Sequence, residues 1–194
     1  MRRTTNTFKE FRDGTSGVSA VEFAVLMPVM TLLLLGSFDI ARAITVKAKT
    51  SQLSSTISDF VSQNQTITED DLDGIIAASK TVLYPFPDTE EVLTVRVESI
   101  RDRGAPTGYV VDWYYQTTID GSVETEGQST DIPGPPPITP TDTSVILATV
   151  NYTYNLKFAG FLGERLGADH FQMTSATSNS PRWGTPVEPS GLDP

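Results

Sequence analysis

The chain lacks cysteine altogether and has a single histidine among its 194 residues. Without cysteine there is no disulfide framework, no thiol nucleophile and no thiolate-ligated zinc or iron–sulfur site. A domain of about 150 residues can hold a core without disulfides, so this composition remains compatible with export. The sequence has no Gly-x-Ser-x-Gly motif, so it offers no nucleophilic serine for the only histidine, His170, to activate. It also has no phosphate-binding glycine loop. We therefore expect no enzyme, no cofactor and no metal site, and we expect His170 to face solvent.

Basic residues are also scarce, with 14 Lys and Arg against 24 Asp and Glu. The net charge of −10 argues against a nucleic-acid partner, because phosphates bind to basic patches. The charge is uneven: residues 1–17 carry a net charge of +2, whereas the chain from Thr50 onward has 20 acidic and 7 basic residues. Basic flanks stay on the cytoplasmic side of a membrane, so the amino terminus should be inside and the acidic part outside.

One apolar run stands out against this background. Sixteen uncharged residues, Phe23 to Phe38, separate Glu22 from Asp39, and apolar residues continue on both sides of the run. A membrane-spanning helix needs about 20 such residues. Pro28 should kink this helix locally, because proline cannot donate the helical hydrogen bond. Beyond the run, Leu53, Ile57 and Phe60 follow at helical spacing, which predicts one helix from about Val18 to about Gln63 that leaves the bilayer near Arg42.

The start of this helix carries the most specific pattern in the chain. Gly17 is followed five residues later by Glu22 and then by Phe23. A carboxylate at the edge of a membrane segment is destabilising unless it is paired or reaches the headgroups. With Pro28 further along, these residues resemble the amino terminus of the TadE-like pseudopilin family, the minor subunits of tight-adherence (Flp-type) pilus systems.

The resemblance implies cleavage between Gly17 and Val18 by a prepilin peptidase on the cytoplasmic face. Glu22 would then meet the free amino terminus of an adjacent subunit, because a carboxylate and an ammonium paired in the bilayer offset each other's desolvation. Phe23 would belong to the same assembly surface. The implied protein is a minor pseudopilin of the bacterial inner membrane, with other pilins and pseudopilins as partners, a periplasmic carboxy-terminal domain and a place in a pilus.

Other interpretations of the amino terminus remain open. Ala41-Arg42-Ala43 has the form of a signal-peptidase site, so a Sec-secreted periplasmic binding module beginning at Ile44 is the runner-up. Asp39 and Arg42 crowd that site, and Sec cleavage gives Glu22 no role. An uncleaved anchor, in which Glu22 only reaches the headgroups, and a membrane-anchored hydrolase with an unrecognised site are further alternatives.

The rest of the chain predicts an α+β domain, with the amphipathic part of the long helix packed on a small antiparallel sheet in meander order. Thr68 and Asp71 form an approximate capping box, so the acidic residues 69–73 indicate a helix start rather than an EF-hand calcium loop. Its buried stripe should comprise Leu72, Ile75, Ile76 and Leu83. Alternating apolar residues predict four strands, at 93–98, 109–119, 144–158 and 170–178, with a turn at 103–108 between the first two.

Two stretches predict loops. The Pro-rich residues 121–143 should form an exposed connector, and 159–169 should form a short helical turn. The expected organisation is a cytoplasmic leader (1–17), a transmembrane and amphipathic helix (18–63), a periplasmic α+β domain (64–180) that includes the Pro-rich loop, and a flexible tail (181–194).

Overall fold

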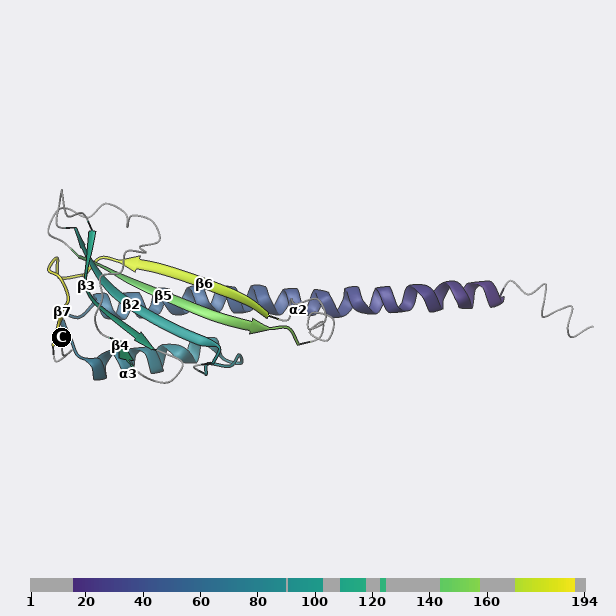
Figure 1. Ribbon diagram of the computed structural model, residues 1–194, viewed down its shortest axis with the longest axis horizontal. Coiled ribbons are helices and arrows are strands. Elements are labelled where there is room, and N and C mark those ends of the chain that lie inside the picture. The colour runs from purple at the N-terminus through teal and green to yellow at the C-terminus, as the bar shows by residue number, and fades with distance from the viewer. Residues whose placement is uncertain are drawn as a thin grey trace, which may run out of the picture. The chain divides into compact units, whose positions relative to one another are not determined.

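The computed structural model describes residues 16–89, 91–102, 109–117, 123–124, 144–157 and 170–190. Within these ranges a long helix, a short helix and an antiparallel sheet follow one another along the chain, which confirms the α+β class (Figure 1). The chain divides into two compact units. The first comprises Met1–Ala41 and Leu156–Asp169, and the second comprises Arg42–Asn155 and His170–Pro194.

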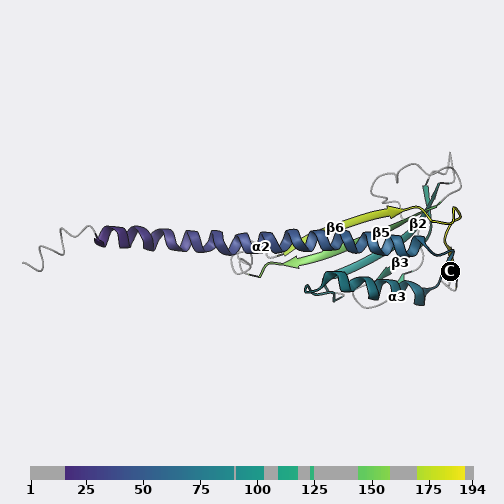
Figure 2. The same cartoon turned by 180° about the vertical axis from the view of Figure 1, so that it is seen from behind.

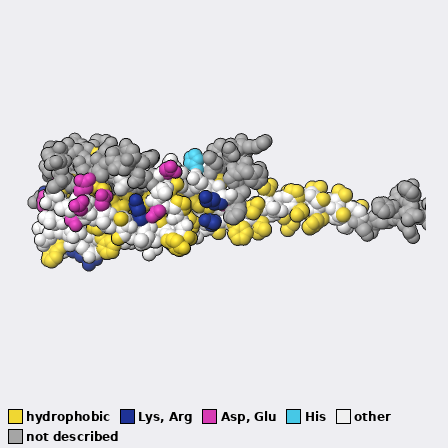
Figure 3. Space-filling model, turned by 90° about the horizontal axis from the view of Figure 1, so that it is seen from below, with side chains coloured by type: hydrophobic (Ala, Val, Ile, Leu, Met, Phe, Trp, Pro, Cys, Tyr) yellow, Lys and Arg dark blue, Asp and Glu magenta, His cyan; other side chains and the backbone are white. Residues whose placement is uncertain are grey.

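The long helix α2 spans Ser16–Ser62, close to the predicted bounds. It runs through Pro28 without interruption, and the local kink expected there stays a prediction. In the first unit its apolar side chains are exposed, and Figure 3 shows them along the amino-terminal half of the helix. The helix is long and apolar enough to cross a membrane, with a mean hydropathy of 2.2 in its most apolar window.

In the second unit α2 buries one stripe of side chains. Leu53 and Ile57 are fully buried, as their spacing predicts. Phe60 is largely exposed and Val61 takes the next buried position, because a step of four from Ile57 keeps to the stripe. Hydroxyl side chains run beside this apolar stripe and contact the sheet, which shows that this half of α2 packs on it. They are Thr50, Ser54 and Ser58.

The short helix α3 spans Glu69–Lys80 and starts as predicted. The Thr68 hydroxyl accepts a hydrogen bond from the Asp71 N–H at 3.2 Å, and the Asp71 carboxylate accepts one from the Thr68 N–H at 3.1 Å. This capping box satisfies amide groups that have no partner inside the helix. The helix continues into a 3-10 turn, η1, at Thr81–Leu83. Of the predicted stripe, Ile75 is half-buried and three residues are buried: Leu72, Ile76 and Leu83.

The main sheet has five antiparallel strands in the order β4-β3-β2-β5-β6. The antiparallel arrangement is confirmed, but the meander order is wrong, because β5 pairs with β2 rather than with β3. Figure 2 shows α3 and the carboxy-terminal half of α2 on the same side of the sheet. The strands are β2 (Leu93–Asp102), β3 (Tyr109–Thr117), β4 (Val123–Glu124), β5 (Ser144–Asn155) and β6 (His170–Asn179).

Residues 181–190, which we call the carboxy-terminal clasp, lie in the stretch predicted to be a flexible tail. Within them β7 (Glu188–Pro189) pairs in parallel with β1 (Thr66–Ile67). Val187 is buried, and its carbonyl accepts a hydrogen bond from the Trp113 indole at 2.8 Å. The buried Val187 and these hydrogen bonds place the clasp on the domain, and the flexibility expected from the four prolines after residue 180 stays a prediction.

Several expectations fall on residues outside the described ranges. They are most of the leader, the turn at 103–108, the helical turn at 159–169 and most of the loop at 121–143. Within that expected loop the two residues of β4 are described, and they pair with the end of β3.

Candidate functional site

The predicted processing site lies in the first turn of α2. Gly17 is the second residue of the helix, and Val18 is exposed. Amide groups in a first helical turn have no partner within the helix. A Cβ added at Gly17 would meet no atom within 4 Å. Nothing in the described part of the chain therefore requires glycine at this position for packing.

Glu22, Phe23 and Pro28 follow on the same helix. The Glu22 carboxylate is exposed, and no group in the described ranges forms a salt bridge with it. Its neighbours Val21 and Phe23 are also exposed, at 65% and 63%. Sequence reasoning placed these residues on one apolar helix, and the structure does so. It thus leaves one carboxylate on a helix surface that is otherwise apolar in this stretch.

Among the described residues of the first unit, Asp39 is a second carboxylate, and sequence reasoning missed its role. Asp39 is only 1% exposed, and its Oδ1 accepts the backbone N–H of Lys157 at 3.1 Å. Asp39 therefore joins α2 to the segment that follows β5. The available signal was a lone carboxylate at the end of a long apolar run, which we interpreted as the boundary of that run and as a residue that crowds the possible signal-peptidase site.

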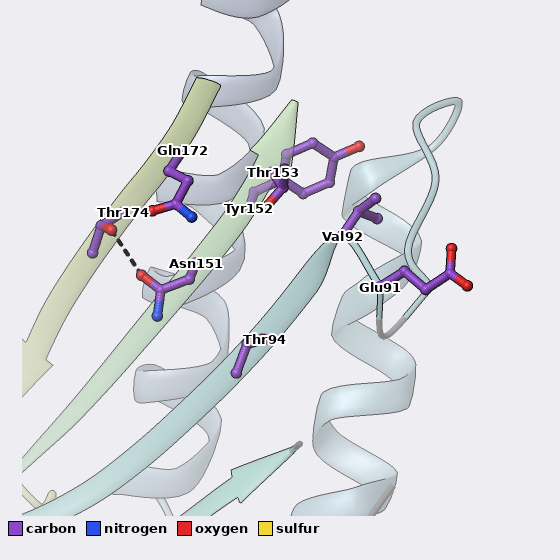
Figure 4. A pocket seen from close by; sticks show the side chains of 8 residues that line it. All are labelled: Glu91, Val92, Thr94, Asn151, Tyr152, Thr153, Gln172 and Thr174. Atoms are coloured by element: carbon purple, nitrogen blue, oxygen red, sulfur yellow. Dashed lines mark hydrogen bonds between the residues drawn. The ribbon is translucent and has the colours of Figure 1, made fainter. Parts of the chain in front are cut away.

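A polar pocket of about 360 Å³ lies across three strands of the second unit (Figure 4). The Thr174 hydroxyl donates a hydrogen bond to Asn151 Oδ1 at 2.7 Å. Neutral hydroxyl and amide groups predominate, and Glu91 is the ionisable carboxylate among them, so the lining favours hydrogen bonding over acid–base chemistry. No sequence motif marked this pocket. Its lining comprises Glu91, Val92, Thr94, Asn151, Tyr152, Thr153, Gln172 and Thr174.

The acidic cluster at the start of α3 has a structural role. Asp71 accepts hydrogen bonds from the side chain and backbone of Thr68, and these lower the pKa of Asp71. Tyr115 reaches α3 from the sheet and donates a hydrogen bond to Asp73, while burial and this carboxylate raise the pKa of Tyr115. Among the described residues, no three His, Asp or Glu side chains are grouped as metal ligands would be. His170 is exposed at the start of β6, as predicted.

Comparison with known proteins identifies one region of the chain. Residues 17–57 match the family model of TadE-like proteins. The match confirms the resemblance and includes Gly17, Glu22, Phe23 and Pro28. No curated protein and no solved structure matches the chain.

Proposed function

Because residues 17–57 form a TadE-like domain, we propose that the protein is a minor pseudopilin that assists assembly of a tight-adherence pilus and surface adhesion. The observation that carries the proposal is the exposed apolar surface of α2. Leu33 is 69% exposed and Val25 67% exposed, although a helix of a water-soluble protein buries its apolar face. Apolar side chains on all sides of a helix are typical of a membrane span. The acidic second unit is then the periplasmic part.

Cleavage after Gly17 is the second element of the proposal. The leader is basic, which keeps it on the cytoplasmic side where a prepilin peptidase acts. A side chain at position 17 would meet no neighbouring atom, so packing does not explain why this residue is glycine. This supports the proposal that the peptidase requires glycine there. After cleavage Val18 carries the new ammonium group, and Glu22 lies one helical turn away.

Assembly is the third element. An unpaired carboxylate in the bilayer is destabilising, and an ammonium group from a neighbouring subunit removes most of that penalty. Glu22 therefore favours lateral packing of α2 against other pilins or pseudopilins. Phe23, directly beside it, supplies apolar contact area for the same packing.

Intact mass of the protein purified from its native membrane tests the processing step. We expect the mass of a chain that begins at Val18, and the full-length mass when the prepilin peptidase gene is deleted. Gly17→Leu should block cleavage. Gly36→Ala is the matched control, because Gly36 lies on the same helix with equally open space around it. Retention of residues 1–17 in the wild type would overturn the proposed cleavage, and a chain beginning at Ile44 would establish Sec secretion.

Pilus formation tests the role of Glu22. Glu22→Ala and Glu22→Gln should both leave membrane insertion intact and reduce piliation, since neither side chain carries the charge that pairs with an ammonium. Glu22→Asp should keep part of the activity. Normal piliation by the Gln variant would contradict the charge pairing, whatever the Ala variant does.

A further inference from the structure

The point at which α2 enters the second unit is basic in an otherwise acidic domain. No Asp or Glu occurs between Asp39 and Asp59, whereas Arg42, Lys47 and Lys49 lie within that interval. Arg42 follows the apolar part of α2 within one helical turn of Phe38. Basic side chains at such a junction reach the phosphates of a bilayer while their stems stay on apolar surface.

An aromatic turn packs at this same point, although it lies about 40 residues further along the chain. We call residues 84–87 the Tyr84 turn. The Arg42 guanidinium lies over the Phe86 ring at 5.6 Å from its centroid. Lys49 Nζ donates a hydrogen bond to the Val82 carbonyl at 2.8 Å, which ties the preceding 3-10 turn to α2. The end of η1 therefore lies beside the first turns of α2 in the second unit.

The exposure of this turn has no explanation within the domain. Tyr84 is 80% exposed, and Pro85 and Pro87 are exposed beside it. The turn is held in place by its own backbone, because the Phe86 N–H donates to the Leu83 carbonyl at 2.9 Å. Tyrosine is enriched where membrane and water meet, since its ring is apolar and its hydroxyl is polar. The exposed Asp88 and Glu91 follow the turn. Arg42 and Lys49 are the basic residues of α2 that contact the turn or η1, whereas Lys47 Nζ donates to the Thr174 carbonyl of β6.

We infer that the Tyr84 turn and Arg42 form a second membrane contact, in which Tyr84 enters the headgroup layer and Arg42 binds lipid phosphate. The inference rests on the proposed membrane span of α2. If α2 leaves the bilayer at Arg42, side chains that contact Arg42 lie at the depth of the bilayer surface. The contact holds the Tyr84 turn at the bilayer surface, and the charge of Arg42 gives it a preference for anionic phospholipids.

Spin labels test this contact, and the absence of cysteine means that each single-cysteine variant has one labelling site. Full-length protein is reconstituted at low density into vesicles of phosphatidylcholine with or without phosphatidylglycerol. Collision rates with oxygen, which enters lipid, and with a water-soluble nickel complex then report depth. Labels are placed at Tyr84→Cys, at Leu33→Cys inside the proposed span, and at Ser180→Cys.

Ser180 is the matched control, because it is exposed and lies next to the clasp that binds the carboxy-terminal end of α2. That end is about 30 Å from Arg42 along the helix. We expect the label at 84 to favour oxygen and the label at 180 to favour nickel. With phosphatidylglycerol present, Arg42→Gln should lower the equilibrium constant for docking of the label at 84 about fivefold.

Two results would overturn the inference. One is a label at 84 as accessible to nickel as the label at 180. The other is a label at 84 that neither reagent reaches, since a neighbouring protein would then cover the turn. Both apply when the label at 33 lies in lipid. A label at 33 in water would instead contradict the proposed span, so the two failures are distinguishable.

Discussion

The two halves of α2 share one backbone but are built for different surroundings. From Val18 to Phe38 the large apolar side chains are exposed except for the half-buried Leu35, whereas from Val46 to Ser62 one stripe is buried against the sheet. The second half also carries hydroxyl groups that bond to strands, such as Ser58 to the Ile146 carbonyl at 3.1 Å. The first half has apolar side chains without such a stripe. A continuous helix thus combines a segment suited to lipid with a segment suited to a protein core.

This difference indicates that the second half of α2 stabilises the fold. Burial against the sheet removes apolar surface from water, and each hydroxyl on the sheet side has a partner. The exposed apolar side chains of the first half have no such burial. Substitutions of the same type in the two halves should therefore have opposite consequences for folding and for membrane insertion.

The largest effect is expected from Leu53→Ala, which leaves a cavity between α2 and the sheet. It should lower the free energy of unfolding by about 2–5 kcal/mol. Urea unfolding of the detergent-solubilised protein, followed by the fluorescence of the buried Trp113, measures this change. Leu33→Ala in the first half is the control and should leave the transition unchanged. Equal shifts for the two variants would contradict the division of α2.

Tyr115→Phe should have the next largest effect, because it removes the hydroxyl that bonds to Asp73 on α3. We expect a loss of about 1–3 kcal/mol, typical of a hydrogen bond to a charged group that is partly buried. Burial and the nearby carboxylate raise the pKa of Tyr115 above its usual value. The stabilisation is therefore complete below about pH 10 and decreases as pH rises further, since the unfolded state loses its proton first.

The pH dependence of unfolding distinguishes this hydrogen bond from simple packing. In the wild type the urea midpoint should fall as pH rises above the ordinary tyrosine pKa, and Tyr115→Phe should flatten that fall. If the urea midpoint falls equally with rising pH in the wild type and in Tyr115→Phe, groups other than Tyr115 cause the alkaline sensitivity.

Ser58→Ala should cost about 1 kcal/mol, because it removes one neutral hydrogen bond to the Ile146 carbonyl. Thr31→Ala is its matched control in the first half. The Thr31 hydroxyl bonds at 2.8 Å to the Met27 carbonyl of its own helix and is exposed. Thermal unfolding of the second unit should respond to the first substitution only, and a response to Thr31→Ala would show that the two halves are coupled.

The smallest effect is expected from Thr68→Ala, which changes the N-cap of α3 and neither half of α2. The substitution removes the hydroxyl bonded to Asp71 and should raise the pKa of Asp71 toward its usual value. The wild-type cap contributes above the ordinary Asp pKa and is lost as pH falls below it. NMR titration of Asp71 measures the change, and an unshifted pKa would contradict the capping box.

Local features of the fold were predictable because they depend on neighbours in sequence. The step of four from Leu53 to Ile57 indicated which face of α2 is buried, and Thr68 with Asp71 indicated where α3 begins. Alternation along 93–98 indicated a strand. The strand order was not predictable, since no pattern in residues 144–155 indicates whether this strand pairs with β2 or with β3.

The carboxy-terminal clasp and the pocket depend on pairings between distant residues. Val187 is one apolar residue among prolines and glycines, and its partner Trp113 lies 74 positions earlier in the chain. The pocket arises because polar residues of three strands meet in register, such as Thr94, Asn151 and Thr174. By contrast, Gly17 and Glu22 were found from their spacing alone, and their roles in processing and assembly await the experiments above.

The clasp also has a consequence for folding during synthesis, because its residues are the last described ones to be made. Carbonyls at the end of α2 and just beyond it accept hydrogen bonds from the clasp: the Ser62 carbonyl accepts the Arg182 N–H at 2.9 Å, and the Gln63 carbonyl accepts the Trp183 indole N–H at 2.9 Å. Because chains emerge amino terminus first, α2 is made and placed long before these donors exist. A nascent chain that ends before residue 181 therefore lacks these two hydrogen bonds. We therefore expect the clasp to pack on the domain only after residues 181–190 have been synthesised.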